Sequence, residues 1–112
     1  MTPAEIAACG VRLIEEKLRS DGYVCCRETE GLGETDILAQ SPDRKILVRV
    51  HAAVAPAYPQ GLSQLDTRSL LDRAAQSGLE AWLYQVQINN HRALVRIVTC
   101  ARIEERRLDT HE

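Results

Sequence analysis

Polar side chains that could do chemistry stand on segments that otherwise read as β-strands. Asp36 is the one acid in the run Thr35–Ala39, and Arg49 and His51 alternate with apolar residues in Lys45–Ala53. An arginine can pair with a carboxylate or contact a phosphate. A histidine, whose unperturbed pKa is about 6.5, can act as a general base. A strand histidine that is satisfied by a neighbouring group is the commoner case.

A second group of such side chains lies on the run Ala81–Ile88. Gln85 and Gln87 share one face of this expected strand. They either line a binding cleft or are ordinary polar residues near a sheet edge, and the sequence does not decide between the two. Trp82 and Tyr84 are better suited to the core and its rim than to stacking on bases.

The first elements that must position these residues are a helix and a short strand. Thr2 is suited to cap the helix, Pro3 to open its first turn and Glu5 to complete a capping box. Apolar residues then recur at helical spacing until Gly22, where we expect the helix to end. Tyr23–Cys26 follows as a short strand.

The next two strands are expected to form a hairpin, Thr35–Ala39 with Lys45–Ala53, around the turn at Pro42. Side chains of the second strand alternate between two faces. One face carries Ile46, Val48 and Val50, and the other carries Leu47, Arg49 and His51.

The remaining segments predict a second helix and two further strands. The helix spans Leu62–Ser77, and the strands are Ala81–Ile88 and Ala93–Thr99. The charged tail from Arg102 is expected to be a short helix or a frayed end. The order of helix, three strands, helix and two strands predicts a mixed α/β sheet with helices on its faces.

Composition limits the class of protein. The chain has 112 residues, which suits one domain, residues 1–112, and its net charge of −2 provides no global basic field for nucleic acid. No run of 18 apolar residues is present, and no signal peptide is visible, so we expect no membrane partner.

The four cysteines, which form no CxxC pair, are interpreted as reduced thiols of a cytoplasmic protein. A reactive thiol or a zinc site is the alternative. These cysteines are Cys9, Cys25, Cys26 and Cys100.

Three local motifs accompany the element order. The helix reads Gly10-Val11, Ile14, Leu18 and Gly22-Tyr23; the second strand reads Gly33-Glu34-Thr35-Asp36-Ile37-Leu38-Ala39; and the third strand reads Val48-Arg49-Val50-His51. In these motifs the chain resembles the PD-(D/E)xK nuclease superfamily, and in particular small bacterial members related to Holliday-junction resolvases. The resemblance implies a restriction-endonuclease-like αβββαβ core.

The resemblance also implies a Mg²⁺ site, made by an Asp on the second strand and by a Glu or Gln two residues before a Lys on the third. Only Asp36 matches this pattern. Val11 stands where the helix Glu belongs, Arg49 where the Glu or Gln belongs, and His51 where the Lys belongs. Because Arg49 is permanently charged, we expect it to pair with Asp36 in place of the metal.

The leading hypothesis is therefore a catalytically degenerate nuclease-fold protein that binds nucleic acid or a protein partner, with no cofactor needed and a homodimer as one form. The candidate nucleic-acid-binding residues are Arg49, Gln85 and Gln87. A second hypothesis is a divergent Mg²⁺-dependent endonuclease that uses Asp36, His51 and a displaced acid, Glu34 or Glu15. A third is a protein-interaction or scaffold module.

The acids that could replace the missing metal ligand can also be ordinary solvated residues. Glu34 follows Gly33, where a solvated turn is expected. Glu15 and Glu16 are expected on the solvated face of the first helix, because they could replace the lost helix carboxylate only if the helix rotated.

Overall fold

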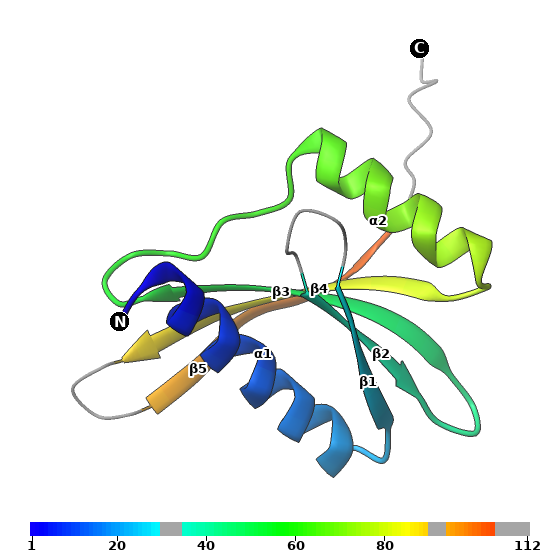
Figure 1. Cartoon of the computed structure of the whole chain (residues 1–112), viewed down its shortest axis with the longest axis horizontal. Coiled ribbons are helices and arrows are strands. Elements are labelled where there is room, and N and C mark those ends of the chain that lie inside the picture. Colours follow the sequence, from blue (N-terminus) through cyan, green and yellow to red (C-terminus); the bar gives the residue numbers. More distant parts are fainter. Residues whose placement is uncertain (30–34, 90–93, 105–112) are drawn as a thin grey trace.

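A mixed five-stranded sheet forms the centre of the molecule, with one helix packed on each face (Figure 1). The computed structural model describes residues 1–29, 35–89 and 94–104. Their elements are α1 (Pro3–Ser20), β1 (Val24–Thr29), β2 (Thr35–Gln40), β3 (Lys45–Val54), α2 (Gln64–Gln76), β4 (Glu80–Asn89) and β5 (Leu94–Ile103). The expected order of elements and the α/β class are confirmed.

The strands lie in sequence order across the sheet. β1, β2 and β3 form an antiparallel meander, α2 then crosses over so that β4 runs parallel to β3, and β5 returns antiparallel to β4. A parallel pair needs such a crossover, because a tight turn joins only antiparallel strands.

Helix α1 begins as the sequence predicts. The Thr2 hydroxyl accepts a hydrogen bond from the Glu5 backbone amide, and the Glu5 carboxylate accepts one from the Thr2 amide. The inner face of α1 then buries Val11, Ile14 and Leu18 against the sheet, where strand residues such as Ile37 and Val48 complete the core.

Gly10 marks the point where α1 comes closest to the sheet. A Cβ atom at this position would lie 2.8 Å from the Ala52 Cβ and 3.2 Å from a Val86 methyl. A glycine is therefore required by close packing here, although it is a poor residue inside a helix.

Helix α2 covers the opposite face. Its buried residues are Leu70 and Ala74, which pack with Leu47 of β3 and Ala81 of β4. Since Ile46 and Val48 belong to the core under α1 while Leu47 belongs to the core under α2, the predicted alternation of β3 is confirmed. Asp36 and Arg49 lie on the α2 face.

The last strand is longer than its sequence predicted. We expected it to end at Thr99 and the tail from Arg102 to be a short helix or frayed, but β5 continues to Ile103. Ala101 and Ile103 pair with Leu83 and Ala81 of β4, and Ile103 packs beside the α2 core. Backbone pairing and this apolar contact outweigh the charged residues that suggested an earlier end.

Neither helix in the described part of the chain is long and apolar enough to span a membrane.

Candidate functional site

A buried ion pair joins the two middle strands of the meander. Asp36 of β2 lies directly opposite Arg49 of β3. The Arg49 Nε donates to Asp36 Oδ1 at 2.8 Å, and its Nη2 donates to Oδ2 at 3.0 Å. Asp36 is 0% exposed and Arg49 is 3% exposed. The expected pairing of these two residues is confirmed, and its bidentate geometry is the strong form of an arginine–carboxylate contact.

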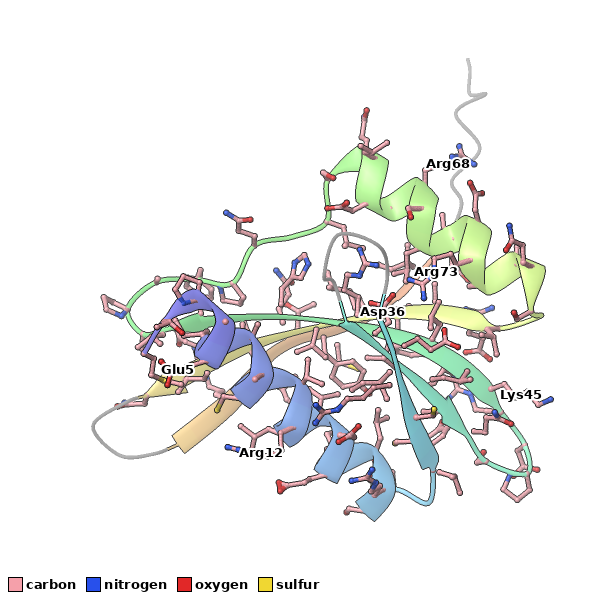
Figure 2. The ribbon with its side chains drawn as sticks, in the orientation of Figure 1. Glu5, Arg12, Asp36, Lys45, Arg68 and Arg73 are labelled. Atoms are coloured by element: carbon pink, nitrogen blue, oxygen red, sulfur yellow. The ribbon has the colours of Figure 1, made fainter. Side chains whose placement is uncertain are left out.

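A second arginine reaches the same carboxylate from the helix above. Arg73 of α2 donates from Nη1 to Asp36 Oδ2, and from Nη2 to Glu28 Oε1 at 3.3 Å. Figure 2 shows the Arg73 side chain directed from α2 toward Asp36. We call these four residues, Glu28, Asp36, Arg49 and Arg73, the Asp36 network.

Sequence reasoning missed Arg73. A signal was present, because Arg73 follows the buried Leu70 by three residues and directly precedes the buried Ala74, which places it at the border of the inner face of α2. The missing information was which strand residue that border would meet.

The Asp36 network does not suit a divalent cation. Mg²⁺ takes several oxygen ligands, whereas both oxygens of Asp36 already accept hydrogen bonds from guanidinium groups. Within residues 1–29, 35–89 and 94–104, three or more His, Cys, Asp or Glu side chains nowhere come together as a metal site. A cation placed at Asp36 would also be repelled by two permanent positive charges.

His51 is engaged with a loop rather than with Asp36. Its Nδ1 lies 2.8 Å from the backbone oxygen of Gln60. Because a carbonyl oxygen only accepts, Nδ1 must carry the proton. The interpretation of His51 as a strand histidine satisfied by a neighbour is confirmed, and no hydrogen bond joins it to Asp36 among the described residues.

Gln85 and Gln87 hold the same loop. The Gln85 amide nitrogen donates to the backbone oxygens of Pro59, at 3.1 Å, and Gln60, at 3.0 Å. The Gln87 nitrogen donates to the Ala57 oxygen at 2.8 Å. All three residues named as nucleic-acid-binding candidates, Arg49, Gln85 and Gln87, thus bind groups of the chain itself.

Glu15 corrects one expectation. It is buried rather than solvated, and both of its oxygens accept hydrogen bonds from Arg27 of β1, at 3.0 and 3.1 Å. The hydrogen bonds from Arg27 hold the pKa of Glu15 below its usual value. Because the side chain of Glu15 is only 8% exposed, the Arg27 guanidinium provides most of the hydrogen bonding that water would give a solvated carboxylate.

Glu15 also lies on the wrong side of the sheet to assist Asp36. It belongs to α1, which covers the face opposite α2. Glu16 is exposed, as expected. Glu34, the other displaced acid, lies outside the described residues.

The aromatic residues of β4 belong to the core and its rim, as predicted. Tyr84 is buried, and this burial raises the pKa of its hydroxyl. Trp82 is partly buried, donates from Nε1 to Glu80 at 3.1 Å, and carries the Arg44 guanidinium 5.4 Å above its ring.

A groove of about 590 Å³ borders the Asp36 network on the α2 face. Apolar and polar side chains line it, from strands β1, β2 and β3 and from the C-terminal part of α2. The lining residues are Glu28, Leu38, Gln40, Lys45, Leu47, Arg73, Gln76, Ser77 and Leu79.

All four cysteines are free, in agreement with the prediction of reduced thiols. Cys25 is partly buried, and burial raises the pKa of its thiol. Such a thiol is less nucleophilic than an exposed one at neutral pH.

Comparison with known proteins gives no significant match to a family model, to a curated protein or to a solved structure.

Proposed function

We propose that the chain is a catalytically inactive domain of the PD-(D/E)xK type that acts by binding a protein partner. The restriction-endonuclease-like core is supported by the helix–meander–helix–strand order and by the place of Asp36 at the start of β2. The retained helix glycine, Gly10, supports it as well, because it permits close packing of α1 on the sheet.

One observation carries the proposal: Asp36, the one residue that matches the nuclease pattern, is buried beneath two arginines. The carboxylate is used to anchor β3 and α2 to β2. Because both of its oxygens accept hydrogen bonds from arginines, this carboxylate stabilises the fold, and the proposed function requires no metal cofactor.

Nucleic acid is the weaker alternative as a partner. The net charge is −2, and the three candidate contact residues are engaged within the chain. Non-specific affinity for nucleic acid depends mainly on Lys and Arg that reach phosphates. The four free thiols suit a reducing compartment such as the cytoplasm.

Incubation of the purified protein with supercoiled plasmid and Mg²⁺ or Mn²⁺ tests the proposal, with Asp36→Ala as the paired sample. The proposal expects no nicking by either protein. Nicking by the wild type that disappears in an Asp36→Ala protein that circular dichroism shows to be folded would establish the divergent endonuclease instead. Gel shifts with single-stranded, double-stranded and branched DNA at low salt test the alternative partner, and salt-sensitive binding to any of them would favour it.

A further inference from the structure

We propose that the groove beside α2, here called the Leu38 groove, binds a short peptide segment of the protein partner that presents an apolar side chain next to a carboxylate. This inference rests on the proposed binding function and names the chemistry that the groove would recognise. The groove measures about 590 Å³. This volume lies within the range of about 300–1,000 Å³ that is usual for ligand sites.

The Leu38 groove is open because α2 covers only part of its side of the sheet. Helix α2 packs on Leu47 of β3 and Ala81 of β4, and β1 and β2 lie beyond β3. Residues of β1 and β2 on that side stay accessible: Gln40 is exposed, and Val24, directly opposite it, is 77% exposed. The groove therefore has a helix along one side and an open strip of sheet along the other.

The register of β2 and β3 fixes the order of groups along the groove. Leu38 lies opposite Leu47, and Gln40 lies opposite Lys45. Side chains two residues apart on a strand share a face and stand about 7 Å apart, so the leucine pair and Lys45 are neighbours. This spacing suits an apolar side chain and a carboxylate that belong to one residue or to adjacent residues.

Four polar side chains of the groove have hydrogen-bonding capacity to offer a ligand. Across the described ranges 1–29, 35–89 and 94–104, these side chains form no hydrogen bond or ion pair with another residue. By contrast, Gln85 and Gln87 are bound to the loop of residues 55–63. The four side chains are those of Gln40, Lys45, Gln76 and Ser77.

Lys45 is the group that would receive an anion. The other charged residues of the lining, Glu28 and Arg73, bind each other. Figure 2 shows Lys45 near the β2–β3 turn, apart from Arg73 on α2. The charged neighbours outside the lining are the Arg44–Glu80 ion pair and the solvent-exposed Asp43 and Asp72. A single ammonium in excess matches the single charge of a carboxylate, and such a charge-assisted hydrogen bond is stronger than a neutral one.

The two glutamines indicate what the rest of the ligand is. A carboxamide both donates and accepts hydrogen bonds, and a peptide group does the same through its N–H and C=O. Gln40 lines the groove from β2 and Gln76 lines it from α2, so an extended peptide between them can bond to both. A fatty acid has no such groups along its chain and is therefore a poorer match.

NMR titration of isotope-labelled protein with defined ligands tests the inference without the natural partner. The probes are the tripeptide Gly-Gly-Leu, its C-terminal amide, Gly-Gly-Ser, acetyl-Leu-Asp-amide and octanoate. Lys45→Gln removes the proposed contact with the carboxylate. Lys17→Gln is the matched control, because Lys17 is the other lysine of the chain and lies on α1. Circular dichroism establishes that both variants are folded.

Gly-Gly-Leu should shift the amide signals of Leu38, Gln40 and Lys45 in a saturable way. Its Kd should rise at least about fivefold in Lys45→Gln and stay unchanged in Lys17→Gln. The C-terminal amide, which tests the same contact without a mutation, and Gly-Gly-Ser, which lacks the apolar side chain, should each bind at least about fivefold more weakly. Tighter binding of acetyl-Leu-Asp-amide than of Gly-Gly-Leu would identify an acidic side chain, and the reverse a chain-terminal carboxylate, as the anion; both results support the inference.

Three outcomes overturn the inference: no saturable shift with either leucine-containing carboxylate, equal affinity of Lys45→Gln and wild type for Gly-Gly-Leu, or tighter binding of octanoate than of both peptides. Failure of the proposed function is recognised separately, by plasmid nicking that depends on Asp36. A protein that neither nicks plasmid nor binds these peptides would leave the proposed function standing and would remove only the Leu38 groove as the recognition site.

Discussion

The position of Asp36 determines what its carboxylate can do. A buried carboxylate must be paired, because its charge loses the stabilisation that water provides. Asp36 has its pair in Arg49 and a second donor in Arg73. Asp36 and Arg49 bind each other across the strands, so removal of Asp36 breaks both hydrogen bonds that the carboxylate accepts from a buried guanidinium.

Replacement of Asp36 by Asn should therefore be strongly destabilising. Loss of one partner of a buried pair costs about 3–5 kcal/mol, and we expect a decrease of this size in the free energy of unfolding, measured by denaturant titration at neutral pH. Glu80→Gln is the control, because its pair with Arg44 is solvent-accessible and should contribute less than about 1 kcal/mol. Equal losses in the two variants would contradict the structural role of Asp36.

Glu15 provides a prediction about pH at the same scale. Hydrogen bonds from Arg27 lower its pKa in the folded state, so the ionised form stabilises the fold. This contribution is complete above the unfolded pKa of about 4.3 and is lost as the pH falls through the lower folded value.

Stability measured against pH for wild type and Glu15→Gln checks this sign. The variant should be less stable at neutral pH, and the difference should shrink as the pH falls below about 4. Glu16→Gln, on the exposed side of α1, should show no comparable change. A constant difference for Glu15→Gln across the whole pH range would show that its ionisation is not involved.

Contacts of the site between neighbouring strands could be predicted from the sequence, whereas contacts between distant segments could not. The Asp36–Arg49 pair was predictable, because a hairpin with alternating side chains brings neighbouring strands into register. Arg73 lies 37 residues after Asp36, and its contact depends on where α2 docks. The roles of His51, Gln85 and Gln87 depended on the path of the loop of residues 55–63, for which the sequence has no periodic signal.

At the scale of elements, the two helices are held on the sheet in different ways. Close packing at Gly10 positions α1, and the ion pairs of Arg73 contribute to the position of α2. The Gly10 position brings the α1 backbone next to Ala52 and Val86. Helix α2 buries only Leu70 and Ala74 fully among its described residues, and Arg73 adds two ionic contacts to the strands. Capping residues and apolar spacing predicted α1, and apolar spacing predicted α2, because these are local properties.

Gly10→Ala tests the close approach. Alanine gains about 1 kcal/mol of helix propensity over glycine, but its Cβ would have to displace α1 from β3. We expect a net loss of unfolding free energy, within the range of about 1–3 kcal/mol for overpacked cores, in denaturant titration. Ala8→Val, at an exposed position of α1, should cost less than about 1 kcal/mol. A Gly10→Ala protein more stable than the wild type would contradict the packing explanation.

The end of β5 could not be predicted from local sequence, because it depends on pairing with β4. Arg102 and the acids after it resemble a solvated tail, yet the backbone of Cys100–Ile103 pairs with β4. This pairing joins segments that are about twenty residues apart, and such a contact outweighs the local preference of a few charged residues.

At the scale of the whole molecule, the sheet separates Asp36 from Glu15, one of the two other acids that the divergent-nuclease hypothesis named. Glu15 lies under α1, and Asp36 lies under α2. A catalytic centre that uses both would require one of them to cross the sheet. The α2 face is instead occupied by the Asp36 network at the start of β2 and, at the end of β3, by the loop of residues 55–63, which Gln85 and Gln87 bind.

The central claim is that arginines, rather than a metal ion, satisfy Asp36. Thermal unfolding of wild type and Asp36→Asn with and without millimolar Mg²⁺ or Mn²⁺ tests this most directly, because a ligand that binds the folded state raises its stability. The account predicts that neither metal raises the midpoint of the wild type relative to the variant. A rise in the wild type that Asp36→Asn abolishes would contradict it.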